Sequence, residues 1–236
     1  MKRFYLIAAL SLLTLSSTAW GYTNTDIIYA QALAKNGIIV DHSSEPEKYR
    51  FDDTISRAEL TGIALKIRGA TLPEDYACKS YYSDVTTNDW ICRAVELSAD
   101  AGLVSRERKT FDPGKDISKS EALSILMKSM GITIETGADR TGYDADVVQW
   151  QVNVLESALK HNIISSAKDF APNRSATRAD VFSIAVSVAI SVTKKSDTAP
   201  TPKMSVSYTP DGDTRNWSSQ YTGGNDSGFI NELTPE

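Results

Sequence analysis

The sequence has few of the residues that usually carry enzyme chemistry or bind metals. Its 236 residues include only two cysteines, Cys78 and Cys92, and two histidines, His42 and His161. Two cysteines cannot complete a four-ligand zinc site, and both histidines lie far from them along the chain. Motifs of the types Gly-x-Ser-x-Gly, His-Glu-x-x-His and the phosphate-binding glycine loop do not occur either. We therefore predict no metal, no cofactor and no catalytic residue, and we interpret the protein as a non-enzyme.

The sequence also lacks an excess of basic residues. It has 25 Lys and Arg against 30 Asp and Glu, a net charge of −5 and a pI of about 5.2. Binding to the phosphates of nucleic acid requires a face rich in Lys and Arg. This balance argues against a nucleic-acid partner, although a single anionic group could still be bound at a local cationic spot.

Long apolar runs are missing beyond the first residues. Lys2 and Arg3 precede an apolar run at 4–15, and small residues at 17–21 offer cleavage positions. The run is short for a membrane span. We predict that residues 1–21 are a signal peptide and that the protein is exported, with an uncleaved anchor as the alternative. No cysteine lies nearby for lipid attachment, and we expect no membrane span after cleavage.

Export bears on the two cysteines, because disulfides persist outside the cytosol. A bond between Cys78 and Cys92 would close a short loop, worth about 3 kcal/mol in the chain-entropy model. We predict this disulfide; the alternative is two unpaired thiols that pack as small apolar residues.

Three short strings of one type recur along the chain. Each has an apolar residue, then Ser or Thr, a cation, a small residue and an acid: Ile55–Glu59, Ile117–Glu121 and Ala176–Asp180. A Gly or Asn followed by two apolar residues precedes each string, at 37–39, 102–104 and 162–164. An aromatic residue lies six positions before each string, at Tyr49, Phe111 and Phe170. These ordered matches indicate three copies of one unit.

Each unit is expected to form a helix, a loop and a second helix. The first helices are predicted at 26–36, 89–101 and 149–161, because Gly37, Gly102 and Asn162 tolerate the left-handed conformation found at helix ends. The second helices begin at the five-residue strings and carry apolar residues at helical spacing, and the third should be the most buried. We predict an all-α fold with three repeats at 22–70, 80–132 and 142–193.

The last part of the chain, 194–236, has a different composition. It is rich in Ser, Thr, Pro, Gly, Asp and Asn and has little apolar periodicity. Such a segment cannot bury enough apolar surface to offset the entropy of ordering. We predict a disordered tail, in which Trp217, Tyr221 and Phe229 are candidates for docking an unknown partner and a fully solvated tail is the alternative.

The five-residue strings have a structural explanation and a possible functional one. The pairs Ser56/Glu59, Ser118/Glu121 and Thr177/Asp180 fit helix capping boxes. A cation at the first helical position opposes the helix dipole, yet Arg57, Lys119 and Arg178 all occupy it. One hypothesis is that each cation, with the free N–H groups of the helix start, binds an anion. The alternative is that each cation pairs with an acid of a neighbouring unit; the two are compatible.

The pattern resembles the S-layer homology (SLH) family. The middle unit shows the family's ordered features as Tyr82-Ser83-Asp84-Val85, Trp90, Gly102-Leu103-Val104, Phe111-Asp112-Pro113 and Ile117–Glu121. The resemblance extends over about residues 23–192. It implies three repeats in a pseudo-threefold arrangement, with the second helices as a central three-helix bundle and grooves between repeats.

The resemblance also implies a function. Similar triplets bind envelope polysaccharides that carry pyruvate ketals, through an Arg that corresponds here to Arg57, Lys119 and Arg178. Trp90 and Trp150 are candidates for stacking on sugar rings, with core packing as the alternative, and Asp84 and Asp144 for hydrogen bonds to hydroxyls, with helix capping as the alternative. We therefore predict a cell-surface, cell-wall or S-layer location, or a periplasmic one if the envelope has an outer membrane.

Departures from the family pattern argue against three equivalent sites. Lys119 replaces an Arg and cannot offer a planar fork, the first repeat has Thr25 in place of a Trp, and the third has Gly142-Tyr143-Asp144 in place of a clean aromatic-x-Asp. Two other functions remain open. One is an envelope protein-assembly or adaptor module without glycan binding; the other is a wall hydrolase, although the acids that recur are already explained as caps.

Overall fold

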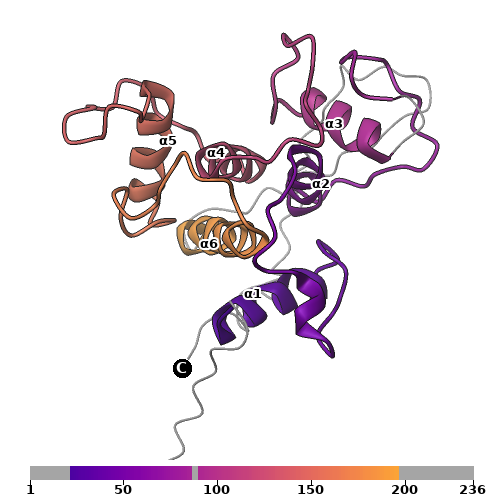
Figure 1. Cartoon of the computed structure of the whole chain (residues 1–236), viewed down its shortest axis with the longest axis horizontal. Coiled ribbons are helices and arrows are strands. Elements are labelled where there is room, and N and C mark those ends of the chain that lie inside the picture. Colours follow the sequence, from indigo (N-terminus) through magenta and orange to yellow (C-terminus); the bar gives the residue numbers. More distant parts are fainter. Residues whose placement is uncertain (1–21, 87–89, 197–236) are drawn as a thin grey trace, which may run out of the picture.

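The computed structural model describes residues 22–86 and 90–196 (Figure 1), so the predicted signal peptide and almost all of the predicted tail lie outside it. These residues form six α-helices: α1 (Asn24–Lys35), α2 (Arg57–Ile67), α3 (Trp90–Asp100), α4 (Lys119–Ser129), α5 (Gln149–Lys160) and α6 (Arg178–Ser196). A 3₁₀ turn, η1 (Pro46–Tyr49), follows α1. The only β-pairing within the described residues is three isolated bridges. The all-α class predicted from the sequence is confirmed.

The first helices end where the sequence predicts. Gly37, Gly102 and Asn162 have φ values of 69°, 70° and 55°, in the left-handed region. In each case the next residue donates its N–H back across the last turn, as Ile38 does to Leu33 O at 3.0 Å and Ile163 to Ala158 O at 2.9 Å. These are Schellman caps, which satisfy carbonyl groups that the helix end would otherwise leave unpaired.

Two boundaries differ from the prediction by more than one residue. α1 begins at Asn24 and not at residue 26, because Thr23 caps it: the Asp26 N–H donates to Thr23 Oγ1, and Asp26 Oδ2 accepts from the Thr23 N–H at 2.7 Å. α6 continues to Ser196, past the predicted end of the third repeat at 193 and into the first residues of the predicted disordered tail, since no Gly or Pro interrupts residues 191–196. Within the described residues no helix is both long and apolar enough to cross a bilayer.

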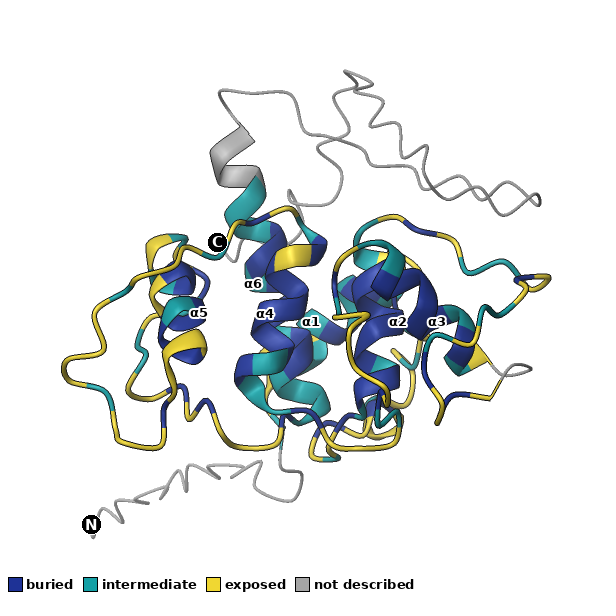
Figure 2. Ribbon diagram, turned by 90° about the horizontal axis from the view of Figure 1, so that it is seen from above, coloured by how far each residue is buried: buried dark blue, intermediate teal, exposed yellow. Residues whose placement is uncertain are grey.

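The helices of the predicted repeats pack on one another (Figures 1 and 2). The second helices lie side by side, with α4 in contact with both α2 and α6. Outside them, α3 packs on α2, α5 packs on α4, and α1 packs on α6. Each first helix therefore packs on the second helix of the repeat before it, and the first helix of the chain packs on the last.

The core lies along the second helices and the loop aromatics. Tyr49, Phe111 and Phe182 are almost fully buried, and Phe182 belongs to a buried run of α6 that includes Val181 and Val186. Tyr49 and Phe51 of the first repeat both contact the ring of Phe182, at centroid distances of 6.5 and 6.1 Å. The aromatic residues that recur before the strings thus fasten the loops of the repeats to the central helices.

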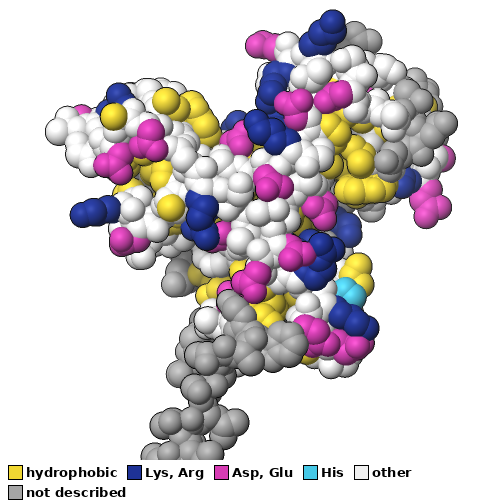
Figure 3. All heavy atoms as spheres, viewed as in Figure 1, with side chains coloured by type: hydrophobic (Ala, Val, Ile, Leu, Met, Phe, Trp, Pro, Cys, Tyr) yellow, Lys and Arg dark blue, Asp and Glu magenta, His cyan; other side chains and the backbone are white. Residues whose placement is uncertain are grey.

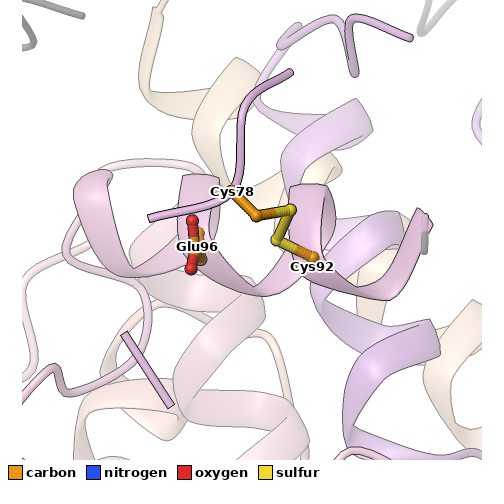
Figure 4. Close-up of side chains that lie close together, drawn as sticks. All are labelled: Cys78, Cys92 and Glu96. Carbon is orange, nitrogen blue, oxygen red and sulfur yellow. A yellow bond between two sulfur atoms is a disulfide. The ribbon is translucent and has the colours of Figure 1, made fainter. Parts of the chain in front are cut away.

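A disulfide joins Cys78 to Cys92, as predicted, with 6.2 Å between the Cα atoms (Figure 4). Glu96 lies beside it, one turn further along α3. Its carboxylate accepts hydrogen bonds from the N–H groups of Lys79 and Tyr81 and from the Tyr76 hydroxyl. Both sulfur atoms and both oxygens have structural partners here, so this cluster fastens the segment before α3 onto the helix.

Candidate functional site

The three strings meet at the starts of α2, α4 and α6. Ile55 N–H donates to Ala176 O at 3.1 Å, Ala176 N–H to Ile117 O at 2.8 Å, and Ile117 N–H to Ile55 O at 3.2 Å. The opening residues of the strings are thus joined by a closed cycle of three backbone hydrogen bonds, which we call the string cycle. The side chains of Ile55, Ile117 and Ala176 are fully buried at its centre.

Each string also forms a capping box. Ser56 N–H and hydroxyl both donate to Glu59 Oε2, at 2.9 and 2.8 Å, while Glu59 N–H donates to Ser56 Oγ at 3.2 Å. Ser118 with Glu121, and Thr177 with Asp180, repeat the arrangement. One oxygen of each acid therefore serves its own helix start, and the other oxygen can accept a second partner.

The helix starts do not offer the free N–H groups that the anion hypothesis assumed. Arg57 N–H donates to Lys115 O at 2.9 Å and Ala58 N–H to Pro113 O at 3.1 Å. The first two N–H groups of α4 and α6 also donate to loop carbonyls. In α4, Lys119 donates to Arg174 O and Ser120 to Pro172 O; in α6, Arg178 donates to Asp53 O and Ala179 to Phe51 O. This premise is wrong, because the loop of another repeat closes over each helix start and accepts from its first donors.

Arg57 is the most enclosed of the three cations. Its Nη1 lies 2.9 Å from Glu121 Oε1, its Nε donates to Phe111 O at 2.9 Å, and its guanidinium lies 4.9 Å from the centre of the Phe111 ring. Only 9% of its side chain is exposed. The Arg57 side chain is therefore held by a carboxylate, a carbonyl and an aromatic face, all from the second repeat.

Lys119 and Arg178 repeat this arrangement with fewer contacts. Lys119 Nζ lies 3.0 Å from Asp180 Oδ1 and 4.7 Å from the Phe170 ring centre. Arg178 donates from Nε to Tyr49 O at 2.7 Å, and its Nη1 lies 3.7 Å from Glu59 Oε1. The pairs run from the first repeat to the second, from the second to the third and from the third back to the first, and we call them the ion-pair cycle.

The alternative that the sequence left open is thus realised: each cation pairs with the capping acid of another repeat. This accounts structurally for a cation at the first helical position, since the carboxylate of the partner repeat offsets the unfavourable dipole. The ion pairs do not test whether the cations also bind a ligand, so that role stays a prediction. Arg178 is the most accessible, with 21% of its side chain exposed and the longest ion-pair distance.

Electrostatics around the ion-pair cycle reflect burial and pairing. Burial alone would raise the pKa of Asp180, but hydrogen bonds from the Thr177 N–H and Lys119 lower the pKa below its usual 3.8. Burial lowers the pKa of Arg178, and the charge of Glu59 opposes that change; an Arg stays charged at neutral pH in either case. Figure 3 shows acidic and basic side chains close together on this face, without a large area of one sign.

The two predicted aromatic ligand residues are half exposed and do not belong to the core. Trp90 and Trp150 occupy the first turns of α3 and α5 and are 46% and 45% exposed. The ring of Trp90 approaches the backbone of α2 at Gly62, where Cζ3 lies 4.0 Å from the position that a Cβ would take. Core packing therefore does not explain these two residues fully, and each leaves a ring surface available for stacking.

The two predicted acidic ligand residues have different environments. Asp84 accepts the N–H groups of Phe111 and Asp112, at 2.8 and 2.7 Å, and so fixes the loop before α4. Asp84 is exposed, and although partial desolvation opposes its ionisation, these backbone donors lower its pKa below the usual value. Asp144 is exposed as well, and its backbone carbonyl accepts from the Val147 N–H. Asp84 therefore has a structural task in holding a loop, which is different from the helix capping that we considered.

The aromatic rings and carbonyl groups that hold the cations were not predicted from the sequence. Phe111 and Phe170 lie under Arg57 and Lys119, whereas Phe182, from the helix itself, lies 5.4 Å from the Arg178 guanidinium. A signal for the first two existed, because both aromatics lie at a constant distance before their strings. The carbonyl acceptors Phe111 O and Tyr49 O left no signal, since any residue type can supply a carbonyl.

Comparisons with known proteins identify a family for part of this region. Residues 81–123 match the S-layer homology domain family, so the resemblance predicted from the sequence is confirmed for a segment inside the second predicted repeat. An amylopullulanase of Thermoanaerobacterium thermosulfurigenes is 28% identical over 144 residues, 58% of this chain and 8% of that protein. An S-layer protein of Bacillus thuringiensis subsp. finitimus is 24% identical over 128 residues, 53% of this chain and 15% of that protein.

A third relative is a surface-layer 125 kDa protein of Lysinibacillus sphaericus, which is 29% identical over 96 residues, 39% of this chain and 8% of that protein. The chain thus corresponds to between 8% and 15% of the length of these relatives. The similarity covers a module of much longer proteins, two of which are named for the surface layer.

Proposed function

We propose that this protein is a non-catalytic module that anchors to the cell envelope by binding a wall polysaccharide, with pyruvylated sugar as the preferred epitope. The observation that carries the proposal is the match of residues 81–123 to the S-layer homology domain. Two relatives are surface-layer proteins, and the amylopullulanase shares only a small part of its length with this chain. The matching segment is shared by an enzyme and by surface-layer proteins. A segment common to proteins with such different names is better explained by attachment than by catalysis.

The proposed binding regions lie between neighbouring repeats, near the starts of the second helices. We propose further that the repeats are arranged about a pseudo-threefold axis, which the string cycle and the ion-pair cycle support. An exposed Trp at the start of α3 or α5 offers a ring for a sugar face, and Arg178 offers an accessible guanidinium for a ketal carboxylate.

The enclosed cations change how the proposal should be tested. More than nine-tenths of the Arg57 side chain is buried, and Arg57 supports the fold, so loss of binding after its substitution would be ambiguous. Lys119 is almost as enclosed, with 13% of its side chain exposed. Trp90, Trp150 and Arg178 are better probes, because each is partly open to solvent.

The test is a sedimentation or surface-binding assay with purified wall polysaccharide. Wild type is compared with Trp90→Ala, Trp150→Ala and Arg178→Ala, and with the exposed-site control Lys66→Ala, after thermal unfolding has shown that each variant is folded. The polysaccharide is used before and after mild acid removal of its pyruvate. We expect the wild type and the control to bind, the site variants to bind about tenfold or more weakly, and pyruvate removal to abolish binding.

The possible results separate the parts of the proposal. Absence of wild-type binding would overturn the anchoring function and favour an envelope protein-assembly module. Binding that is unaffected by all three substitutions would overturn the site and leave the function intact. Binding that persists after pyruvate removal would overturn the assignment of the epitope alone.

A further inference from the structure

A pocket of about 270 Å³ lies at the opposite ends of the helices from the ion-pair cycle. Met130, the C-cap of α4, and His161, the C-cap of α5, line it together with Ser191 and Val192 of α6. Ser191 and Val192 lie near the carboxyl end of α6, so this end of α6 forms one wall of the pocket.

The lining of this pocket combines apolar surface with negative potential. Met130, Ile132 and Val192 supply apolar side chains. The carboxyl ends of α4 and α5 both lie at the pocket, and each contributes the partial negative charge of a helix C-terminus. Glu135 also lines it, with its carboxylate in contact with Lys160. Such a lining suits a group that has an apolar stem and a positively charged end.

The helix pair α2 and α3, which we call the preceding lobe, has a side chain at the position that corresponds to this pocket between α4 and α5. Arg68 is the C-cap of α2, as Met130 is of α4, and Ala101 follows α3 as His161 follows α5. In that lobe the partly buried Arg68 extends toward the end of α3, with Nη1 3.5 Å from Ala101 O. One lobe thus carries its own guanidinium between two helix ends, and the other carries a methionine and an open pocket.

We propose that this pocket binds a terminal guanidinium or ammonium group on a short alkyl stem, in the position that the Arg68 side chain fills in the neighbouring lobe. The stem packs against Met130, Ile132 and Val192, and the charged end lies toward the carboxyl ends of α4 and α5. The ligand is either a small free cation or a basic side chain of an extended peptide, since both present the same chemistry. The site is independent of polysaccharide binding and lies away from the predicted sugar residues.

The binding test uses butylguanidine as the free cation and acetyl-Gly-Arg-Gly-amide as the peptide. The neutral control is acetyl-Gly-citrulline-Gly-amide, which keeps the shape of Arg and removes its charge. Binding to the full chain is followed by NMR through the ring protons of His161 and the methyl group of Met130. We expect both cations to shift these signals, and the citrulline peptide to bind at least about tenfold more weakly.

Two variants test the position of the site. Met130→Arg introduces the guanidinium found in the neighbouring lobe and should abolish probe binding and raise the melting temperature. Thr71→Arg adds the same charge at an exposed position outside the pocket and should leave binding unchanged. Ser191→Trp fills the pocket without adding charge and should also abolish binding, which keeps the test decisive if Met130→Arg does not fold.

Equal binding of the arginine and citrulline peptides would overturn the proposal, as would binding that survives Ser191→Trp. A peptide that binds while butylguanidine does not identifies a basic side chain as the ligand, and the reverse result identifies a small free cation. Polysaccharide binding by Met130→Arg should equal that of the wild type, so a failure here is distinguishable from a failure of the anchoring function.

Discussion

Ala171 occupies a backbone conformation that suits alanine poorly. Its φ is 52°, in the left-handed region, and Arg50 and Asp112 have φ values of 56° and 59° at the same position of the other repeats. Each directly follows the loop aromatic that precedes its string. The loop must turn sharply there so that its following carbonyls reach the start of a second helix in another repeat. The backbone strain is thus tied to the assembly of the repeats.

Ala171→Gly is expected to stabilise the protein by up to about 1 kcal/mol. Glycine removes a left-handed penalty of about 1–2 kcal/mol and loses part of that gain to greater freedom of the unfolded chain. Urea denaturation measures the change. Ala145→Gly is the control, because Ala145 is exposed and lies outside the left-handed region, and it should destabilise slightly. A loss of stability in Ala171→Gly as large as in the control would contradict the argument.

Asp180 makes the stability of the protein dependent on pH in the acid range. The pKa of Asp180 is lower in the folded protein than its usual 3.8, despite burial, because Thr177 and Lys119 donate to it. A carboxyl whose pKa falls on folding contributes stability that is present above the unfolded pKa and is lost as pH falls through the folded pKa. The contribution of Asp180 should therefore be complete at neutral pH and disappear below pH 3.8.

Asp180→Asn tests this dependence. We expect the variant to be less stable than wild type by about 1–3 kcal/mol at pH 7. The difference should shrink steadily as the pH is lowered through the pKa of the carboxyl, and denaturation series between pH 7 and pH 2 measure it. A difference that stays constant down to pH 2 would mean that the charge of Asp180 does not stabilise the fold.

At the scale of the helices, the three ion pairs should contribute unequally to stability. Arg57 is the most buried, at 9% side-chain exposure, and Arg178 is the most exposed, at 21%, with its carboxylate partner 3.7 Å away. We expect Arg57→Ala to cost about 2–4 kcal/mol, because it leaves Glu121 and the Phe111 carbonyl without a partner. Arg178→Ala should cost about 1 kcal/mol, closer to a surface pair.

Thermal and urea unfolding of the three cation variants measure this order, with Lys119→Ala expected between the other two. Lys66→Ala is exposed on α2 and should change stability by less than about 0.5 kcal/mol. Equal costs for all three cations would show that burial does not govern the ion-pair cycle.

Helix ends were predictable because their signals are local. Gly37 and Asn162 mark the ends of α1 and α5 within a single turn of chain, and the capping pairs lie three residues apart. The start of α1 was predicted two residues late, although Thr23 and Asp26 have the same spacing as Ser56 and Glu59. The same rule, applied to α1, would have placed its start correctly.

The partners of the cations were not predictable because they depend on how distant segments meet. Arg57 pairs with Glu121, 64 positions later, and donates to Phe111 O, 54 positions later. Each string ends in a capping acid, and no local feature of the sequence shows which cation pairs with which acid. The use of the helix-start N–H groups by loop carbonyls could not be foreseen either, since a carbonyl acceptor requires no particular side chain.

At the scale of the whole molecule, the two cycles make the repeats interdependent. Ala176 O of the third repeat accepts a hydrogen bond from the Ile55 N–H of the first repeat, and α6 packs on both α1 and α4. In an open solenoid each repeat contacts only its neighbours, and a shortened array can remain folded. Here removal of one repeat exposes apolar faces on both remaining ones.

A chain that ends at residue 132 should therefore lose cooperative unfolding. Such a chain keeps α1 to α4 but lacks α6, on which α1 and α4 both pack. We expect a broad, non-cooperative thermal transition in circular dichroism and poor dispersion of NMR signals, compared with a single sharp transition of the longer chain. A sharp transition in the shortened chain would show that the repeats fold as separate units.

The pairing of the first helix with the last also has a consequence for the order in which the molecule can be built. α1 emerges early during synthesis, yet the surface it packs on belongs to α6, which begins 143 positions after α1 ends. A growing polypeptide thus has no finished native core until its sixth helix exists.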